Sequence, residues 1–258
     1  MRRHLAFPCG ADTLVGTLDM EAATGPAAIL LVSGGREVRA GSWGGQAQIA
    51  ARLAAAGIPV LRYDRRGIGE SEGTDPSFLN TRDDLAAALS ALRTTVPTLR
   101  RVIAFGNCDA AAALMLHGAE LALDGLVLAN PWTLETDEAQ AAPPEALRRR
   151  YLAKLANPRE VLRLLTGGVN LAKLARGLKQ AASNAPKSSL VEAMAANLAR
   201  FPGPVTILLA SGDRTAQMFE AVWPAADPRI QRHASSGHSF AGEDAQDWLF
   251  ERLLEAVR

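Results

Sequence analysis

Short apolar runs alternate with longer amphipathic segments along most of this chain. The apolar runs end in glycine or polar residues, as in strands buried on both faces, and the amphipathic segments repeat their apolar residues at helical spacing. The expected strands cover residues 26–35, 58–64, 100–106, 123–131, 203–213 and 229–234. The expected helices cover residues 42–57, 78–96, 109–121, 216–223 and 245–258. This alternation predicts an α/β fold, in which helices cover both faces of a mostly parallel sheet.

Two regions depart from this alternation. Residues 4–20 alternate apolar and polar positions around a Gly-Ala-Asp turn, which predicts a β-hairpin. Residues 139–200 show helical patterns but no convincing strand. We therefore expect a core of residues 1–132 and 201–258 that carries a helical cap, or lid, inserted at residues 133–200.

The composition is typical of a globular protein: 48% of the 258 residues are hydrophobic, 21% are charged and the formal net charge is +1. This balance argues against a nucleic-acid-binding protein. No apolar run reaches the roughly 18 residues that a membrane span needs, and the first residues lack the apolar stretch of a signal peptide. The 2 cysteines form neither a disulfide framework nor a zinc set, so we expect a reducing, cytoplasmic location and no metal.

The expected cap carries a large share of the positive charge. Residues 139–200 hold 11 Lys or Arg and 3 Asp or Glu, a net charge of +8, which leaves −7 on the rest of the chain. Basic residues on amphipathic helices commonly lie on a solvated face, with their aliphatic stems on apolar surface. The alternative is a lid that attracts an anionic substrate, an acidic acyl carrier protein or an anionic membrane surface. The sequence leaves both interpretations open.

The stretch Gly-Asn-Cys-Asp-Ala at residues 106–110 follows an expected strand and begins an expected helix. It fits the G-x-S-x-G pattern of a nucleophile elbow, with Cys108 in place of serine. Gly106 and Ala110 are small, as a strained turn between a strand and a helix requires. A helix N-terminus favours a thiolate. Taken alone, the stretch nevertheless favours a buried structural cysteine over a nucleophile.

Two further residues follow later strands. Asp213 ends the expected strand at 203–213, and His238 lies in a loop rich in glycine and serine after the strand at 229–234. The chain order of nucleophile, acid and histidine is the one that catalytic triads use on this kind of sheet. Either residue alone fits a structural turn or loop position equally well. Their joint placement at strand ends favours a catalytic interpretation of Cys108, Asp213 and His238.

Glycines follow the first long expected strand. Gly34 and Gly35 let the backbone approach a ligand closely, so the N–H of Gly35 or of Arg36 is a candidate oxyanion donor, together with the N–H of Asp109. A plain glycine turn is the alternative. After the next strand, Asp64 is placed to accept hydrogen bonds from the backbone of the loop that follows, which is a supporting role.

These motifs resemble those of the α/β-hydrolase superfamily over essentially the whole chain. The stretches that carry the resemblance are LLVSGG, YDRRGIGES, GNCDA, LLASGD and SSGHSF. The insertion matches the place where that superfamily carries its cap. More narrowly, the chain resembles hydrolase 1 of exosortase A systems, which combines a Gly-Gly oxyanion loop with a cysteine elbow. It departs from many superfamily members in having Ser33 where they show a histidine, and a cysteine as the nucleophile.

The residues and the resemblance together imply an acyl hydrolase that cleaves a small-molecule ester or thioester. In this interpretation Cys108 attacks the carbonyl, His238 moves the proton and Asp213 orients His238. Gly34 and Trp132, near the start of the cap, would line the acyl pocket, and no metal or organic cofactor is implied. Two other hypotheses stay open: an acyltransferase that uses the same acyl-cysteine intermediate, and a non-catalytic binding protein on a hydrolase scaffold.

Overall fold

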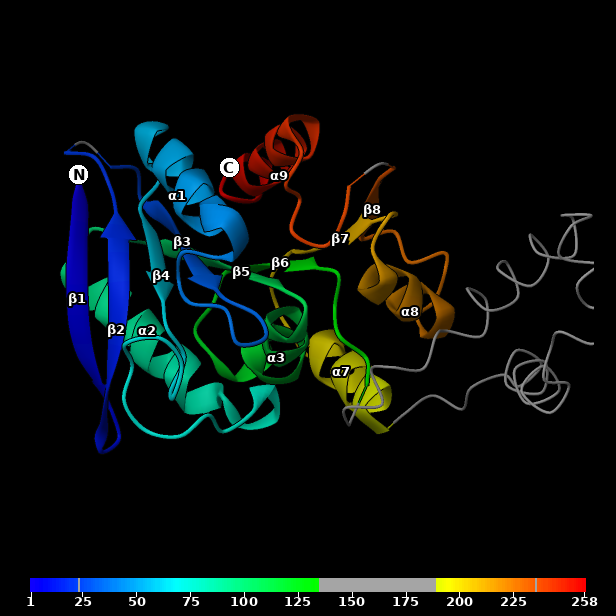
Figure 1. The fold of residues 1–258 in the computed structure, drawn as a ribbon, viewed down its shortest axis with the longest axis horizontal. Helices are drawn as coiled ribbons and strands as arrows, with labels where there is room; N and C mark the ends of the chain where they lie inside the picture. Colours follow the sequence, from blue (N-terminus) through cyan, green and yellow to red (C-terminus); the bar gives the residue numbers. More distant parts are fainter. Residues whose placement is uncertain (23, 135–188, 235) are drawn as a thin grey trace, which may run out of the picture.

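The computed structural model describes residues 1–22, 24–134, 189–234 and 236–258 (Figure 1). Its strands form one eight-stranded sheet in the order β1-β2-β4-β3-β5-β6-β7-β8. Their bounds are β1 Arg2–Cys9, β2 Asp12–Asp19, β3 Ala27–Val32, β4 Val60–Tyr63, β5 Arg101–Asn107, β6 Gly125–Ala129, β7 Val205–Ala210 and β8 Ile230–His233. β1 pairs antiparallel with β2, and β2 antiparallel with β4, while the remaining pairs are parallel. The predicted hairpin and mostly parallel sheet are therefore confirmed.

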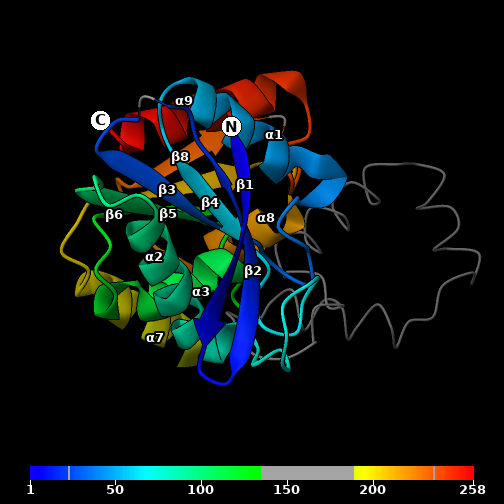
Figure 2. The same ribbon diagram turned by 90° about the vertical axis from the view of Figure 1, so that its left-hand side faces the viewer.

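Helices cover both faces of this sheet, as predicted. The described α-helices are α1 Gly45–Ala55, α2 Arg82–Thr95, α3 Asp109–His117, α7 Ser189–Ala199, α8 Arg214–Val222 and α9 Glu243–Ala256. α1 and α9 lie over one face, whereas α2, α3 and α7 lie over the other (Figures 1 and 2). Short 3-10 helices at Ser42–Gly44, Phe78–Asn80 and Gly118–Glu120 shorten the α-helical part of three predicted helices.

β3 shows why the central strands are apolar throughout. Its alternate side chains enter two different cores: Leu30 and Val32 pack on the side of α2 and α3, while Ile29 and Leu31 pack on the side of α1 and α9. All four side chains are completely buried. A strand covered on both faces has no polar side, so its sequence reads as a continuous apolar run.

The last part of the expected cap is helix α7. Its buried residues Leu190, Met194 and Leu198 belong to the core on the side of α2 and α3, and α7 packs against α3. Residues 135–188, which include most of the expected cap and nearly all of its basic residues, lie outside the described residues. The proposal of a basic lid therefore stays a prediction.

Candidate active site

Cys108 lies between β5 and α3, at the edge of the sheet where the parallel strands end. Its backbone has φ 62° and ψ −127°, a conformation that is costly for a residue with a side chain. The backbone N–H of Cys108 donates to the carbonyl of Ala129 at 3.0 Å, and its carbonyl accepts from Trp132 at 3.2 Å. The side chain is partly exposed, and both Cys108 and Cys9 are free thiols. The predicted strained turn is present, and its strain is held by the neighbouring strand β6.

Two glycines make this turn sterically possible. A Cβ on Gly106 would lie 2.8 Å from the carbonyl carbon of Ala110, closer than packed atoms tolerate. A Cβ on Gly34 would lie 2.3 Å from the carbonyl oxygen of Asn107 and 3.2 Å from the Cβ of Cys108. Gly34 therefore brings the loop after β3 directly against the elbow, as the sequence interpretation of the glycines required.

His238 and Asp213 are brought together from loops that follow β8 and β7. Nδ1 of His238 lies 2.9 Å from Oδ2 of Asp213, and the Asp213 side chain is almost completely buried. The same oxygen accepts from the N–H of Ala216 at 3.1 Å, so Asp213 also caps the N-terminus of α8. The hydrogen bond from Ala216 orients the carboxylate of Asp213, and this carboxylate in turn orients the imidazole of His238.

The charges of this pair are coupled to the thiol. The hydrogen bond from Asp213 raises the pKa of His238 to about 10, and Cys108 acts in the same direction through a hydrogen bond and through charge, against the opposing effect of burial. Burial acts to raise the pKa of Asp213, but the hydrogen bonds from His238 and from the backbone of α8 outweigh it and hold that pKa below its usual value. His238 therefore holds its proton more tightly than a free histidine, because Asp213 and Cys108 both act to raise its pKa.

The loop after β3 lies beside the elbow, and the N–H groups expected to bind an oxyanion differ in their hydrogen bonding. The N–H of Gly35 donates to Oδ1 of Asp109 at 2.6 Å. Arg65, whose side chain is only 3% exposed, donates to the carbonyl of Gly35 and lies 3.3 Å from Oδ2 of Asp109. The N–H groups of Arg36 and Asp109 have no hydrogen-bond partner among the described residues. Of the candidate donors, these two are therefore free to bind a ligand oxygen.

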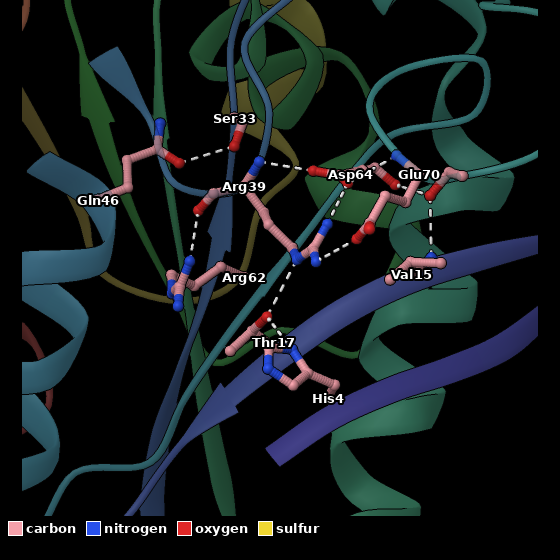
Figure 3. A network of polar contacts seen from close by, with 10 residues as sticks. His4, Val15, Thr17, Ser33, Arg39, Gln46, Arg62, Asp64 and Glu70 are labelled. Carbon is pink, nitrogen blue, oxygen red and sulfur yellow. Dashed lines mark hydrogen bonds and ion pairs between the residues drawn. The ribbon is translucent and has the colours of Figure 1, made fainter. Parts of the chain in front are cut away.

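A network of polar contacts holds the same loop from behind (Figure 3). Asp64, at the end of β4, is completely buried and accepts from the backbone N–H of Arg39 at 2.6 Å and from that of Glu70 at 3.1 Å. The guanidinium of Arg39 donates to the carboxylates of Asp64 and Glu70. It also donates to the hydroxyl of Thr17 at 3.0 Å. The predicted support of the following loop by Asp64 is confirmed, and it extends to the loop after β3.

A comparison with known protein families shows to which family the chain belongs. The model of the alpha/beta hydrolase family matches residues 29–252, most of the chain. The chain belongs to the alpha/beta hydrolase family. No curated protein matches its sequence.

Solved structures agree on the fold at low sequence identity. The alpha/beta hydrolase GrgF from Penicillium sp. sh18 superposes with a TM-score of 0.64 at 17% identity, covering 100% of this chain and 98% of its own. An esterase from Pyrococcus furiosus gives 0.60 at 15% identity, covering 100% and 92%. The thioesterase domain from the curacin biosynthetic pathway gives 0.58 at 13% identity, covering 98% and 99%. This chain is thus an alpha/beta hydrolase whose fold is shared with an esterase and a thioesterase.

Two asparagines of this alpha/beta hydrolase that the sequence motifs did not single out bind the loop that carries His238. The side-chain amides of Asn107 and Asn130 both donate to the backbone carbonyl of His238, at 3.0 Å and 3.2 Å. Asn107 is part of the elbow, and Asn130 directly follows β6. The rule that singled out polar residues at strand ends applies equally to Asn130, so a signal for it was present.

Trp132, which is expected to line the acyl pocket, is partly buried, and its indole N–H donates to the carbonyl of Leu134 at 2.8 Å. Leu134 is the last described residue before the expected cap, so the pocket role of Trp132 stays a prediction. The described residues contain no group of three or more His, Cys, Asp or Glu placed to hold a metal ion. Within the same residues, every helix is too short or too polar to cross a membrane.

Proposed function

We propose that this protein is an acyl hydrolase that cleaves an ester or thioester through an acyl-cysteine intermediate. The observation that carries the proposal is the hydrogen bond between the buried Asp213 carboxylate and His238, whose pKa is raised by Asp213 and also by Cys108. The strained backbone of Cys108, at the N-terminus of α3, supports the role of nucleophile. The esterase and thioesterase with the same fold support the substrate class.

We propose that the proton lies on His238 when Cys108 attacks, so that the sulfur reacts as a thiolate. The raised pKa of His238 favours this distribution, and the positive end of the α3 dipole favours negative charge at Cys108. A thiolate is the reactive form of cysteine, so no proton has to leave the sulfur during attack.

Acylation is the first proposed step. The thiolate forms a bond to the carbonyl carbon, and the electron pair of the C=O bond moves to the oxygen. The N–H groups of Arg36 and Asp109 stabilise this oxyanion, because the N–H of Gly35 is bound to the Asp109 carboxylate. When the oxyanion collapses, the bond to the leaving group breaks and His238 gives that group its proton.

Deacylation uses the same residues in the opposite sense. His238 is now neutral, and Asp213 holds it through Nδ1 so that Nε2 can accept a proton from water. The resulting hydroxide attacks the thioester carbonyl, the carboxylic acid leaves, and the Cys108 thiolate and His238 imidazolium are restored. Gly34 and Trp132 border this site and are proposed to line the acyl pocket.

The test is the hydrolysis of a panel of p-nitrophenyl esters and acyl thioesters by the wild type, Cys108→Ala and Cys9→Ala. Cys9 is buried beside Asp84 and distant in sequence from the site, so Cys9→Ala controls for the loss of a thiol. We expect Cys108→Ala to lower kcat by at least about 10³-fold, and Cys9→Ala to leave it within about twofold. Equal rates in wild type and Cys108→Ala would overturn the proposal.

The finer assignments rest on the sequence. The resemblance to hydrolase 1 of exosortase A systems, carried by the Ser-Gly-Gly loop and the cysteine elbow, proposes membership of that subgroup. An acyl carrier protein as substrate carrier and a cytoplasmic location are proposals of the same kind. In the panel above, rapid acylation of Cys108 with slow release to water but fast release to an added alcohol would identify an acyltransferase instead.

A further inference from the structure

The carbonyl of His238 is held by two side-chain amides from neighbouring strand ends. Nδ2 of Asn107 and Nδ2 of Asn130 lie 3.0 Å and 3.2 Å from this oxygen. The two amides are also bound to each other, since Nδ2 of Asn130 donates to Oδ1 of Asn107 at 3.0 Å. The histidine therefore has two attachments, its ring to Asp213 and its backbone to this amide pair.

Asn130 is itself locked in place. It is completely buried and its Oδ1 accepts from the N–H of Ala210 at 2.9 Å, while its own N–H donates to the carbonyl of Leu208 at 2.9 Å. Its φ of 43° lies in the left-handed region, which Asn tolerates better than most residues. β6 lies between β5 and β7, so Asn130 links the strand that carries Cys108 to the strand that leads to Asp213.

We infer that Asn107 and Asn130 are positioning residues, which hold the backbone of His238 where its ring can reach both Cys108 and Asp213. This inference rests on the proposed function, because positioning matters only if the pair of Cys108 and His238 performs chemistry. The amides touch neither the sulfur nor the imidazole ring in any hydrogen bond among the described residues.

The chemical nature of these donors suits the position. His238 gains and loses a proton in the proposed cycle. A charged side chain hydrogen-bonded to its backbone carbonyl would favour either the protonated or the neutral imidazole. Neutral amides restrain the loop without such a bias. The loop needs restraint, because it is rich in glycine and serine and His238 remains partly exposed. Misplacement of a catalytic group by about 1 Å can cost about 10²-fold in rate.

The test compares Asn107→Leu, Asn130→Ala and the double variant with the wild type. Leucine matches the shape of asparagine and cannot donate. We expect each single variant to lower kcat by about tenfold with KM within about twofold. The double variant should lose less than the product of the two, because both amides act on one oxygen. NMR titration of the imidazole should show the pKa of His238 moving down towards the value of a free histidine.

Asn197→Ala is the matched control, because Asn197 donates its amide to a helical carbonyl, that of Ala193, on α7. It should leave kcat and the pKa of His238 unchanged. Wild-type kcat and wild-type pKa in folded Asn107→Leu would overturn the inference, while Cys108-dependent hydrolysis in the wild type would keep the proposed function. Because Asn107 is only partly buried, Asn107→Leu decides the matter even if Asn130→Ala does not fold. Activity that survives in Cys108→Ala would remove both proposals.

Discussion

The loops on either side of Cys108 are held by different kinds of interaction. The oxyanion loop, residues 33–41, is held by charges: Arg39 pairs with the buried carboxylate of Asp64, and Arg65 donates to the carbonyl of Gly35. The histidine loop, residues 236–241, is held by neutral donors. The amides of Asn107 and Asn130 bind the carbonyl of His238, and the indole of Trp43 donates to the hydroxyl of Ser239 at 3.2 Å.

This difference fits the roles proposed for the two loops. The loop at residues 33–41 is proposed to supply backbone N–H groups to an oxyanion, and the charge of these groups never changes, so permanent ion pairs can fix the loop without affecting the chemistry. His238 changes its charge in the proposed cycle, and the groups that act on the charge of its ring are Asp213 and Cys108. Rigidity and electrostatic control are thus separated in the histidine loop, where the amides restrain the backbone and Asp213 sets the proton.

The largest expected effect comes from breaking the ionic support of the oxyanion loop. Asp64→Ala removes the acceptor of the Arg39 guanidinium and of two backbone N–H groups. Because this carboxylate is completely buried, we expect the free energy of unfolding to fall by about 3–5 kcal/mol, measured by urea denaturation. Glu70→Ala removes the other carboxylate that Arg39 binds. Because the Glu70 side chain is 67% exposed, this change should cost less than about 1 kcal/mol. Equal losses in the two variants would show that the buried ion pair does not hold this loop.

A smaller effect tests whether the proton lies on His238. The pKa of His238 is raised to about 10, so the stabilisation it provides is complete below its ordinary value of 6.5 and is lost as the pH rises through about 10. The pKa of Asp213 is lowered, so its contribution is present above 3.8 and is lost only in stronger acid. The gap in unfolding free energy between wild type and Asp213→Asn should therefore be widest near about pH 5.5 and narrow towards about pH 10.

This gap should stay modest, because the His238 side chain is 39% exposed and solvent screens the pair. Asp227→Asn is the matched control: Asp227 also has a lowered pKa, but its partners are Trp223 and Arg229. The difference in unfolding free energy between wild type and Asp227→Asn should not narrow between about pH 5.5 and about pH 9, because no partner of Asp227 titrates there. A gap for Asp213→Asn that widens with pH would contradict the assignment of the proton to His238.

Much of this arrangement could be predicted from the sequence. Periodicity gave the strands and helices, because β3 and its neighbours are apolar on both faces and the helices on one. Polar residues at strand ends then pointed to Cys108, Asp213 and His238, and the structure brings Asp213 and His238 within hydrogen-bond distance. Gly34 and Gly106 could be assigned as well, since the tight turn leaves no space for a side chain.

Other features depend on information that periodicity does not contain. The role of Asn130 follows from the position of β6 between β5 and β7, and the order of strands in a sheet is not written in the hydrophobic pattern. The bond between the N–H of Gly35 and Asp109 joins residues 74 positions apart through a single side-chain rotamer. For the same reason, the sequence could not show that the N–H of Gly35 is bound to Asp109, whereas the N–H of Arg36 has no hydrogen-bond partner among the described residues.

The most direct test of the account is the rate at which iodoacetamide alkylates Cys108. It is measured against pH in a Cys9→Ala background, in which Cys108 is the sole thiol, with and without His238→Ala. If His238 holds the proton and the sulfur is a thiolate, alkylation at about pH 6 is at least about tenfold faster with His238 present, and the two rates converge at about pH 9.5. Identical rates and identical pH dependence in the two variants would contradict the account.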